Sequence, residues 1–176
     1  MGPLALSTSV TARLSVGAVT IIAHSMLALA AAHHVSFTVA DMDRSLRFYR
    51  DLLGLEVLAD WVSETDYLKT ITGFPDARMR LAFLRLPGTE VRLELIQYLA
   101  PSTPGPAAPT NSPGAAHLCF DVPDIQAAYR DLRAAGVAFR SEPVEITSVA
   151  NRGAWGVYLS DPDGITVELR QPPAPR

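Results

Sequence analysis

The chain has 176 residues, of which 48% are hydrophobic and 19% are charged, with a formal net charge of −3. These values are typical of a globular protein with one domain, or with two small modules that share a core. The slightly acidic balance gives none of the basic surface that nucleic-acid-binding proteins carry, so we expect no nucleic-acid partner. The single cysteine, Cys119, excludes an internal disulfide and a zinc site built from several thiolates.

Residues 1–32 differ from the rest of the chain, and we interpret them as an N-terminal extension. Residues 14–32 carry no acidic or basic side chain other than His24, follow Arg13 and end in three alanines, which is also the pattern of a secretory signal peptide. Serine, threonine and histidine dilute the apolar run, so the segment is short and polar for a membrane span. We expect a cytoplasmic protein with no membrane partner; secretion through residues 1–32 is the alternative.

The remainder of the chain contains a repeat, in which the segment 34–41 is echoed at 117–124. In both segments apolar residues alternate with polar ones, which predicts a strand with one buried face and a histidine on the other. An amphipathic helix is expected after each strand, over 43–53 and 125–135, and each ends at a glycine suited to a left-handed cap. The distance from histidine to glycine is 20 residues in one copy and 19 in the other, which indicates an internal duplication.

The order of the later elements is also repeated. Alternation and turn residues predict three further strands in each copy, at 55–62, 80–86 and 90–98 and again at 137–140, 154–159 and 165–170. Residues 64–77 interrupt the first copy with a short predicted helix at 65–71, followed by a turn.

The sequence therefore predicts an α+β fold of two tandem βαβββ modules. The first module covers 33–99 and the second 114–172. The segment between them, 100–113, is rich in proline and predicts a semi-extended linker, and residues 173–176 form a tail.

Each module ends in a predicted strand with one glutamate between apolar neighbours, Glu94 in the first and Glu168 in the second. A carboxylate in such a strand is costly to bury unless it is paired or bound to a metal. With His34 and His117 these residues form a set of two imidazoles and two carboxylates, which suits Zn²⁺, Ni²⁺, Co²⁺, Fe²⁺ or Mn²⁺. The alternative is structural: each glutamate pairs with the arginine two residues away, Arg92 or Arg170.

The sequence resembles the vicinal oxygen chelate superfamily, which includes glyoxalase I, methylmalonyl-CoA epimerase, extradiol dioxygenases and bleomycin-resistance proteins. The resemblance covers about 33–172 and rests on the segments 34–41, 48–55 and 161–164, the last leading into Glu168. It implies that the two modules form an open, cup-shaped mixed sheet with helices outside and one divalent metal ion on the concave face.

Residue by residue, the resemblance places the metal ligands at His34, Glu94, His117 and Glu168, which are expected to meet at one point. Retention of Glu94 favours the glyoxalase and epimerase branch, because extradiol dioxygenases generally use two histidines and one glutamate. In the implied chemistry a substrate with two neighbouring oxygens chelates the ion, which stabilises an enolate while a carboxylate moves the proton. Glu168 is the first candidate for this base and Glu94 the second.

We therefore expect a metal-dependent isomerase, epimerase or lyase that acts on a small oxygen-chelating substrate. A metal-free small-molecule or antibiotic-binding resistance protein and an extradiol-type dioxygenase are the alternatives. The insertion at 64–77 is a candidate substrate-facing flap, and Arg78 and Arg80 are candidates to meet an anionic group. We expect a homodimer. Candidate substrate contacts, for which a structural role is equally open, are Ser36, Thr38, Tyr67, Tyr98, Asp121 and Thr166.

Overall fold

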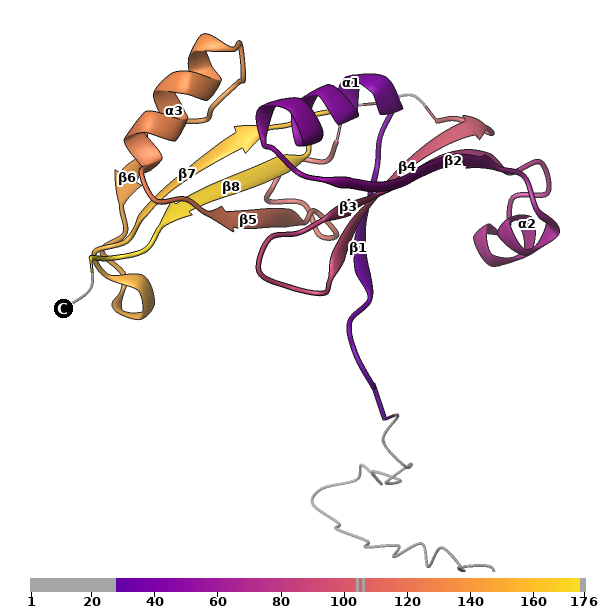
Figure 1. Ribbon diagram of the computed structural model, residues 1–176, viewed down its shortest axis with the longest axis horizontal. Helices are drawn as coiled ribbons and strands as arrows, with labels where there is room; N and C mark the ends of the chain where they lie inside the picture. Colours follow the sequence, from indigo (N-terminus) through magenta and orange to yellow (C-terminus); the bar gives the residue numbers. More distant parts are fainter. Residues whose placement is uncertain (1–27, 104, 106, 175–176) are drawn as a thin grey trace, which may run out of the picture. The chain divides into compact units, whose positions relative to one another are not determined.

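The computed structural model describes residues 28–103, 105 and 107–174, and the chain divides into two units, 1–32 and 33–176 (Figure 1). Only residues 28–32 of the first unit are described, and they have no regular secondary structure. The predictions of a signal peptide or an extension therefore fall almost wholly outside the described residues. In the part of the chain that the structure describes, no helix is long and apolar enough to cross a membrane.

The first module forms a four-stranded mixed sheet with the strand order β1-β4-β3-β2. Strand β1 runs parallel to β4, and the other neighbours are antiparallel. The elements of this module are β1 (His34–Thr38), α1 (Met42–Leu46), the π-helical turn η1 (Arg47–Leu52), β2 (Val57–Ser63), α2 (Asp66–Thr72), β3 (Arg78–Arg85) and β4 (Arg92–Ala100).

The second module repeats this topology in a second four-stranded sheet with the order β5-β8-β7-β6. Here β5 is parallel to β8, as β1 is to β4. The elements are β5 (His117–Asp121), α3 (Ile125–Ala134), β6 (Val144–Glu145), the short 3₁₀ helix η2 (Val149–Asn151), β7 (Trp155–Ser160) and β8 (Thr166–Gln171). The predicted α+β fold of two βαβββ modules is thus confirmed.

The two copies also share the way in which their first helices begin and end. Asp41 and Asp124 cap α1 and α3, each accepting a hydrogen bond of 2.9 Å from a backbone N–H three residues later. Gly54 and Gly136 follow the helices with φ of 75° and 86°, the left-handed conformation that only glycine adopts without strain.

One predicted strand, 137–140, is wrong. Two backbone hydrogen bonds tie this segment to β7, from Arg140 N–H to the carbonyl of Tyr158 and from Ser160 N–H to the carbonyl of Ala138, but only Phe139 forms a bridge. Pro143, which has no N–H to donate, lies in the irregular stretch that follows. Strand β6 follows this proline and is the edge strand of the sheet.

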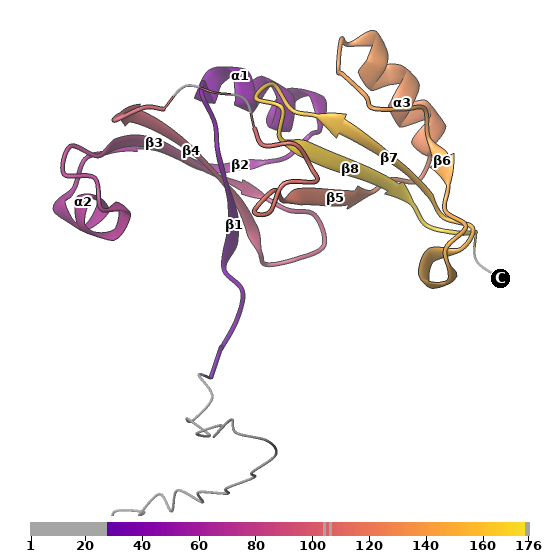
Figure 2. The same ribbon diagram turned by 180° about the vertical axis from the view of Figure 1, so that it is seen from behind.

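The apolar core lies between the sheets and the helices α1 and α3. Figures 1 and 2 show both helices on the same side of the sheets. Residues of β4 and β8 that point toward the helices are almost fully buried: Leu93, Leu95, Val167 and Leu169. The residues between them in sequence therefore face the other way, onto what we call the open face of each sheet.

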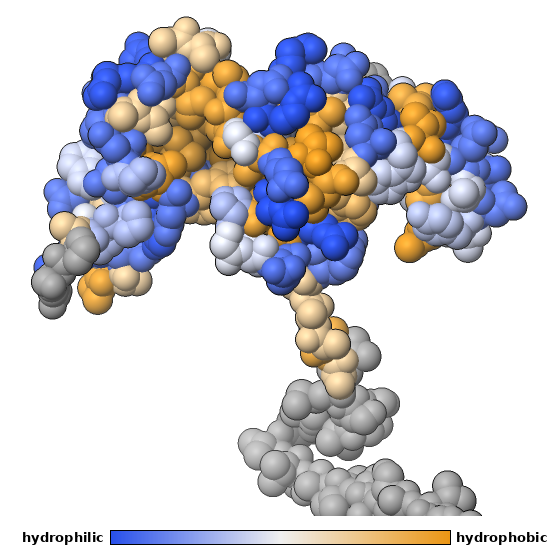
Figure 3. All heavy atoms as spheres, viewed as in Figure 1, coloured by the Kyte–Doolittle hydropathy of each residue, from blue (hydrophilic) through white to orange (hydrophobic). Residues whose placement is uncertain are grey.

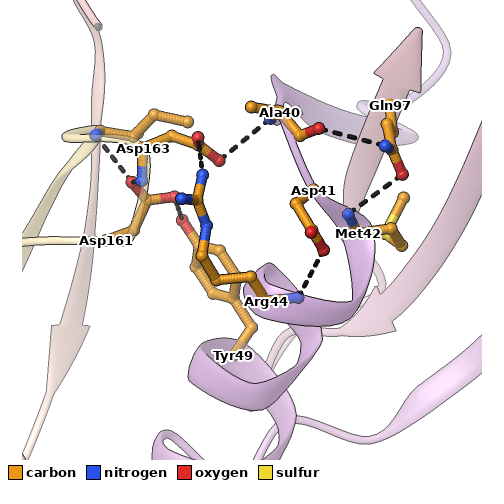
Figure 4. Close-up of polar contacts among 9 residues, drawn as sticks. Ala40, Asp41, Met42, Arg44, Tyr49, Gln97, Asp161 and Asp163 are labelled. Carbon is orange, nitrogen blue, oxygen red and sulfur yellow. Dashed lines mark hydrogen bonds and ion pairs between the residues drawn. The ribbon is translucent and has the colours of Figure 1, made fainter. Parts of the chain in front are cut away.

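Polar contacts join the first module to the β7–β8 turn of the second (Figure 4). The Tyr49 hydroxyl, fully buried, donates a hydrogen bond of 3.0 Å to Oδ2 of Asp161, whose Oδ1 accepts from the N–H groups of Asp163 and Ile165. Arg44 forms an ion pair with Asp163, which also accepts from the Ala40 N–H. Burial raises the pKa of Asp161 above its usual range, so its hydrogen bonds are what make a carboxyl group acceptable there.

A hollow of about 560 Å³ lies on the helix side, between η1 and the segment that follows α3. Phe48, Leu52 and Val137 line it together with Arg44 and Arg47 at its rim. Figure 3 shows apolar surface between the hydrophilic side chains of α1 and α3. None of the histidines and glutamates of the open faces lines this hollow.

We predict that Tyr49→Phe lowers the free energy of unfolding by about 1–3 kcal/mol, because it removes the donor to Asp161 Oδ2 and leaves a buried polar atom unpaired. Urea unfolding followed by circular dichroism measures the change. The segments 49–52 and 129–132 both read Tyr-Arg-Asp-Leu, so Tyr129 is the counterpart of Tyr49, but its hydroxyl contacts Arg133 at the surface; Tyr129→Phe is therefore the matched control. Equal losses in the two variants would contradict the importance of the buried contact.

Candidate metal and substrate site

The structure brings each predicted histidine to the glutamate of its own module. His34 Nε2 lies 3.4 Å from Oε2 of Glu94, and His117 Nε2 lies 3.2 Å from Oε2 of Glu168. Among the described residues, however, no three or more side chains of histidine, cysteine, aspartate or glutamate gather in a metal-binding group. The expectation that all four meet at one point is therefore not met within one chain, which carries two separate His–Glu pairs.

The alternative structural role for the glutamates, pairing with a neighbouring arginine, is not what the structure shows. Arg170 forms its ion pair with Asp121 at 2.7 Å, and Arg92 lies over the ring of Phe83 at 5.7 Å. Each glutamate has a histidine within 4 Å and no arginine. The two carboxylates are thus free of guanidinium partners in the described part of the chain.

The strand register extends the repeat beyond these pairs, because the residues opposite each glutamate across the sheet also correspond. In an antiparallel or parallel pair, residues directly opposite one another project to the same face. One row runs across the open face of the first sheet: Ser36, Glu94, Phe83 and Ala59. The matching row of the second sheet continues past β7 to the segment tied to it: Cys119, Glu168, Tyr158 and Arg140.

Glu94 is the more tightly held of the two carboxylates. The Ser36 hydroxyl donates a hydrogen bond of 2.6 Å to Oε2 of Glu94, and the residue is only 9% exposed. A short bond to a charged acceptor is strong and fixes the side chain. Glu94 is therefore suited to a fixed role, such as a permanent ligand.

Glu168 is held less tightly than Glu94. Its neighbour at the Ser36 position is Cys119, whose thiol is a weaker hydrogen-bond donor than a hydroxyl. Partial burial and the charge of Glu168 raise the pKa of Cys119 to about 11, so the thiol stays protonated at neutral pH and is no nucleophile. The residue as a whole is nevertheless exposed to solvent.

Tyr158 stands where the first module has Phe83, directly opposite Glu168. Its ring lies 5.3 Å from that of His117, and burial together with the charge of Glu168 raises the pKa of its phenol. The hydroxyl therefore remains a donor at neutral pH. It adds a polar group to the second open face at a place where the first has only an aromatic ring.

Glu168 also lines a hollow of about 670 Å³ on the open face of the second sheet. The turn between β3 and β4 of the first module, with Pro87 and Gly88, forms one wall, and Asn151 and Arg170 form another. The space is sufficient for a small molecule and opens to solvent. Glu168 is thus reachable by a substrate in a way that the buried Glu94 is not.

The predicted substrate contacts are scattered across the two open faces. Ser36 is bound to Glu94, and Asp121 is engaged with Arg170. Thr166 is buried and accepts a hydrogen bond from Arg140. The remaining three lie near α2: Thr38 and Tyr98 line another hollow, and Tyr67 is exposed on the helix itself.

The predicted flap, 64–77, contains α2, which packs on the open face of the first sheet. Leu68 is buried against Met79 and Leu81, and the cluster includes Ile96 and Tyr98. Exposed apolar side chains remain on this segment, among them Ile71 and Phe74. The insertion therefore adds an apolar border to the open face of the first sheet, and its role as a substrate-facing flap stays a prediction.

The two arginines predicted to meet an anionic group are already paired. Arg80 forms ion pairs of 2.8 and 2.9 Å with Asp60 and Asp43, and Arg78 lies 3.6 Å from Glu64. The structure instead places Arg140 on the open face. The sequence did not single out Arg140, because only the pairing of its segment with β7 places it in the same row as Glu168.

The residues present are suitable for a divalent ion in chemical type and in pairwise spacing. Each pair offers one imidazole nitrogen and one carboxylate oxygen close enough to bind the same ion, which amounts to half of a two-histidine, two-carboxylate shell. A complete shell needs the two halves to come together. One pair alone would leave most coordination positions to water or to a substrate.

Comparison with known proteins identifies one matching family and several similar proteins. The model of the Glyoxalase/Bleomycin resistance protein/Dioxygenase superfamily matches residues 31–169. The chain is 34% identical over 148 residues to a 2-epi-5-epi-valiolone epimerase from Actinomyces sp, covering 82% of this chain and 80% of that protein. It is 30% identical to the mitochondrial methylmalonyl-CoA epimerase of Homo sapiens, covering 79% and 72%.

A solved structure agrees in fold. The glyoxalase family protein APC24694 from Bacillus cereus superimposes with a TM-score of 0.75 at 24% identity, covering 86% of this chain and all of that one. The duplicated βαβββ topology, the matching family model and these relatives point the same way. The chain belongs to the Glyoxalase/Bleomycin resistance protein/Dioxygenase superfamily.

Proposed function

We propose that this protein is a divalent-metal-dependent epimerase that moves a proton at a carbon next to a carbonyl group of a small substrate. The observation that carries the proposal is the pair of matching His–Glu contacts, free of arginine, on equivalent strands of the two modules. The two relatives named above are both epimerases. Their substrates, a cyclic polyhydroxylated ketone and an acyl-CoA thioester, make carbonyl compounds the first class to test.

The proposal includes a homodimer, because one chain provides only two separate halves of a metal site. In this arrangement His34 and Glu94 of one protomer face His117 and Glu168 of the other, and the two-fold axis generates two equal sites. Each His–Glu pair of such a dimer belongs to one complete metal site, so the dimer needs no further subunit.

The ion, when bound, supplies a Lewis acid that lowers the cost of negative charge on the substrate oxygens. Glu168 removes the proton from the neighbouring carbon on one face, and inversion is completed when a solvent proton reaches the opposite face of that carbon. Glu168 is suited to this task because it is reachable from the hollow and has only a weak donor, Cys119, beside it. Glu94 stays in place because of the Ser36 hydrogen bond.

Other residues of the two rows orient the substrate. Phe83 and Trp61, whose rings lie 5.6 Å apart, form an apolar wall on the first sheet. Tyr158 offers a hydroxyl beside Glu168 on the second. A substrate between the two halves meets an apolar surface on one side and hydrogen-bond donors on the other.

A metal-free binder of small molecules is the second candidate. The separation of the two His–Glu pairs within the described chain favours it, since a protomer acting alone would not complete a coordination shell. The two candidates differ in one measurable property, the tight binding of a divalent ion.

We predict that metal binding requires both halves and that they act between chains. A variant lacking the first pair (His34→Ala, Glu94→Ala) and one lacking the second (His117→Ala, Glu168→Ala) each bind no ion as homodimers. The heterodimer of the two, purified with two different tags, binds about one ion, because it contains one site with both halves intact. Elemental analysis of the three dimers gives the result.

An unloaded heterodimer, beside a wild-type protein that carries about one ion per chain, would show that each site is built within one chain. A wild-type protein that takes up no ion would favour the metal-free binder. A monomeric wild-type protein that binds metal would overturn the dimer and leave the enzyme proposal standing.

We predict that Glu168→Gln slows exchange of the substrate C–H proton with D2O by about 100-fold or more, because the amide cannot act as a base. NMR of 2-epi-5-epi-valiolone and methylmalonyl-CoA, incubated with metal-loaded protein, measures the exchange. Glu94→Gln is the matched variant at the equivalent position and should weaken metal binding more than it slows exchange at saturating metal. The reverse pattern would assign the base to Glu94.

A further inference from the structure

The two open faces differ most at the far end of the rows that contain the glutamates. The position after Phe83 in the first row is Ala59, and the position after Tyr158 in the second is Arg140. The duplication has therefore placed a long cationic side chain on one half of the site and a methyl group on the other. Strands lie about 4.8 Å apart, so the Arg140 backbone is about 10 Å from that of Glu168 across the sheet.

The Arg140 side chain is held in place by hydroxyl groups and not by a carboxylate. One terminal nitrogen donates to Thr110 Oγ1 at 2.8 Å, and the other donates to Thr166 Oγ1 at 3.1 Å. Thr166 is directly opposite His117 in the β5–β8 register, so the guanidinium reaches toward the His117–Glu168 pair. No acidic residue within the described ranges forms an ion pair with Arg140. By contrast, Arg170 on β8 is paired with Asp121, and Arg85 at the end of β3 is paired with Glu56.

Hydroxyl partners orient a guanidinium without neutralising it. The charge of Arg140 thus remains available, and the Nε–H and the remaining N–H groups are not used by the two threonines. A planar guanidinium of this kind binds carboxylate or phosphate through two parallel hydrogen bonds. The neighbouring Tyr158 hydroxyl adds a donor between Arg140 and Glu168.

We propose that Arg140 forms an anion-binding subsite and that the substrate is a carbonyl compound carrying a carboxylate or phosphate group. This inference rests on the proposed function, since it places the anionic group relative to the carbon on which Glu168 acts. The chelating oxygens lie at the His–Glu pairs, and the anionic group lies a few bonds away, along the row through Tyr158. Ala59 leaves the first half without a counterpart, so the substrate binds in one orientation.

Arg92 is the competing candidate, because it is also on an open face without an acidic partner in the described residues. Its guanidinium, however, lies over the Phe83 ring, a contact that already uses part of its charge. Arg92 is also opposite His34 in the first module, where the row of open-face residues ends beyond Phe83 in the apolar Ala59. Arg92→Gln is therefore the matched control for Arg140→Gln.

The test uses three chelators with the same hydroxamate head and different arms, titrated by calorimetry into the zinc-loaded protein. Glycolohydroxamate has a neutral arm, phosphoglycolohydroxamate has a phosphate, and succinomonohydroxamate has a carboxylate. We expect wild-type protein to bind at least one anionic chelator about tenfold tighter than the neutral one, a difference of about 1.4 kcal/mol. The phosphate and carboxylate arms show which anion is preferred.

Arg140→Gln should remove this preference and leave the affinity for glycolohydroxamate unchanged, whereas Arg92→Gln should retain the preference. Arg140→Lys keeps the charge but not the paired donors, and should retain only part of it. Equal affinity of the wild-type protein for all three chelators, or a preference that survives Arg140→Gln, would overturn the anion subsite and leave the metal site intact. Failure of all three to bind would overturn the metal site itself, and the subsite with it.

Discussion

The candidate site depends on a single constraint, the alternation of side chains along β4 and β8. Leu93, Leu95 and Val167 are completely buried beneath the helices, and Leu169 is almost so. Because successive side chains of a strand project to opposite sides, the burial of these residues makes Glu94 and Glu168 point to the open face. A shift of one residue in either strand would exchange the two sets and place the carboxylates in the core.

The same constraint explains why each module builds its half of the site independently. The parallel pairing of β1 with β4 sets His34 beside Glu94, and the pairing of β5 with β8 sets His117 beside Glu168. Nothing in this local register determines how the two halves meet. That depends on how the modules are joined, and the joining contacts, centred on Asp161 and Asp163, involve none of the four histidine and glutamate side chains.

Much of the fold was predictable because it follows from short-range patterns. The period of two located most strands, and the glycines marked the ends of the first helices. Residues 137–140 were misread as a strand because the sequence does not show that the segment makes only one bridge before the chain turns at Pro143. The His–Glu pairs were predictable for the same reason as the strands, but their separation within one chain was not.

What the sequence could not reveal was the set of neighbours around each pair, since strand register is a long-range property. Tyr158 comes opposite Glu168, and Arg140 opposite Tyr158, only through the pairings of β7. Ser36 and Cys119 come beside the glutamates through β1 and β5. Once aligned, the two rows agree at the glutamates, which have matching histidines beside them, and differ at every other position. Groups that would hold an ion must be alike in both halves, because the shell is shared. A substrate that lacks two-fold symmetry must be bound by groups that differ between the two halves. The replacement of Phe83 by Tyr158, and of Ala59 by Arg140, meets that requirement.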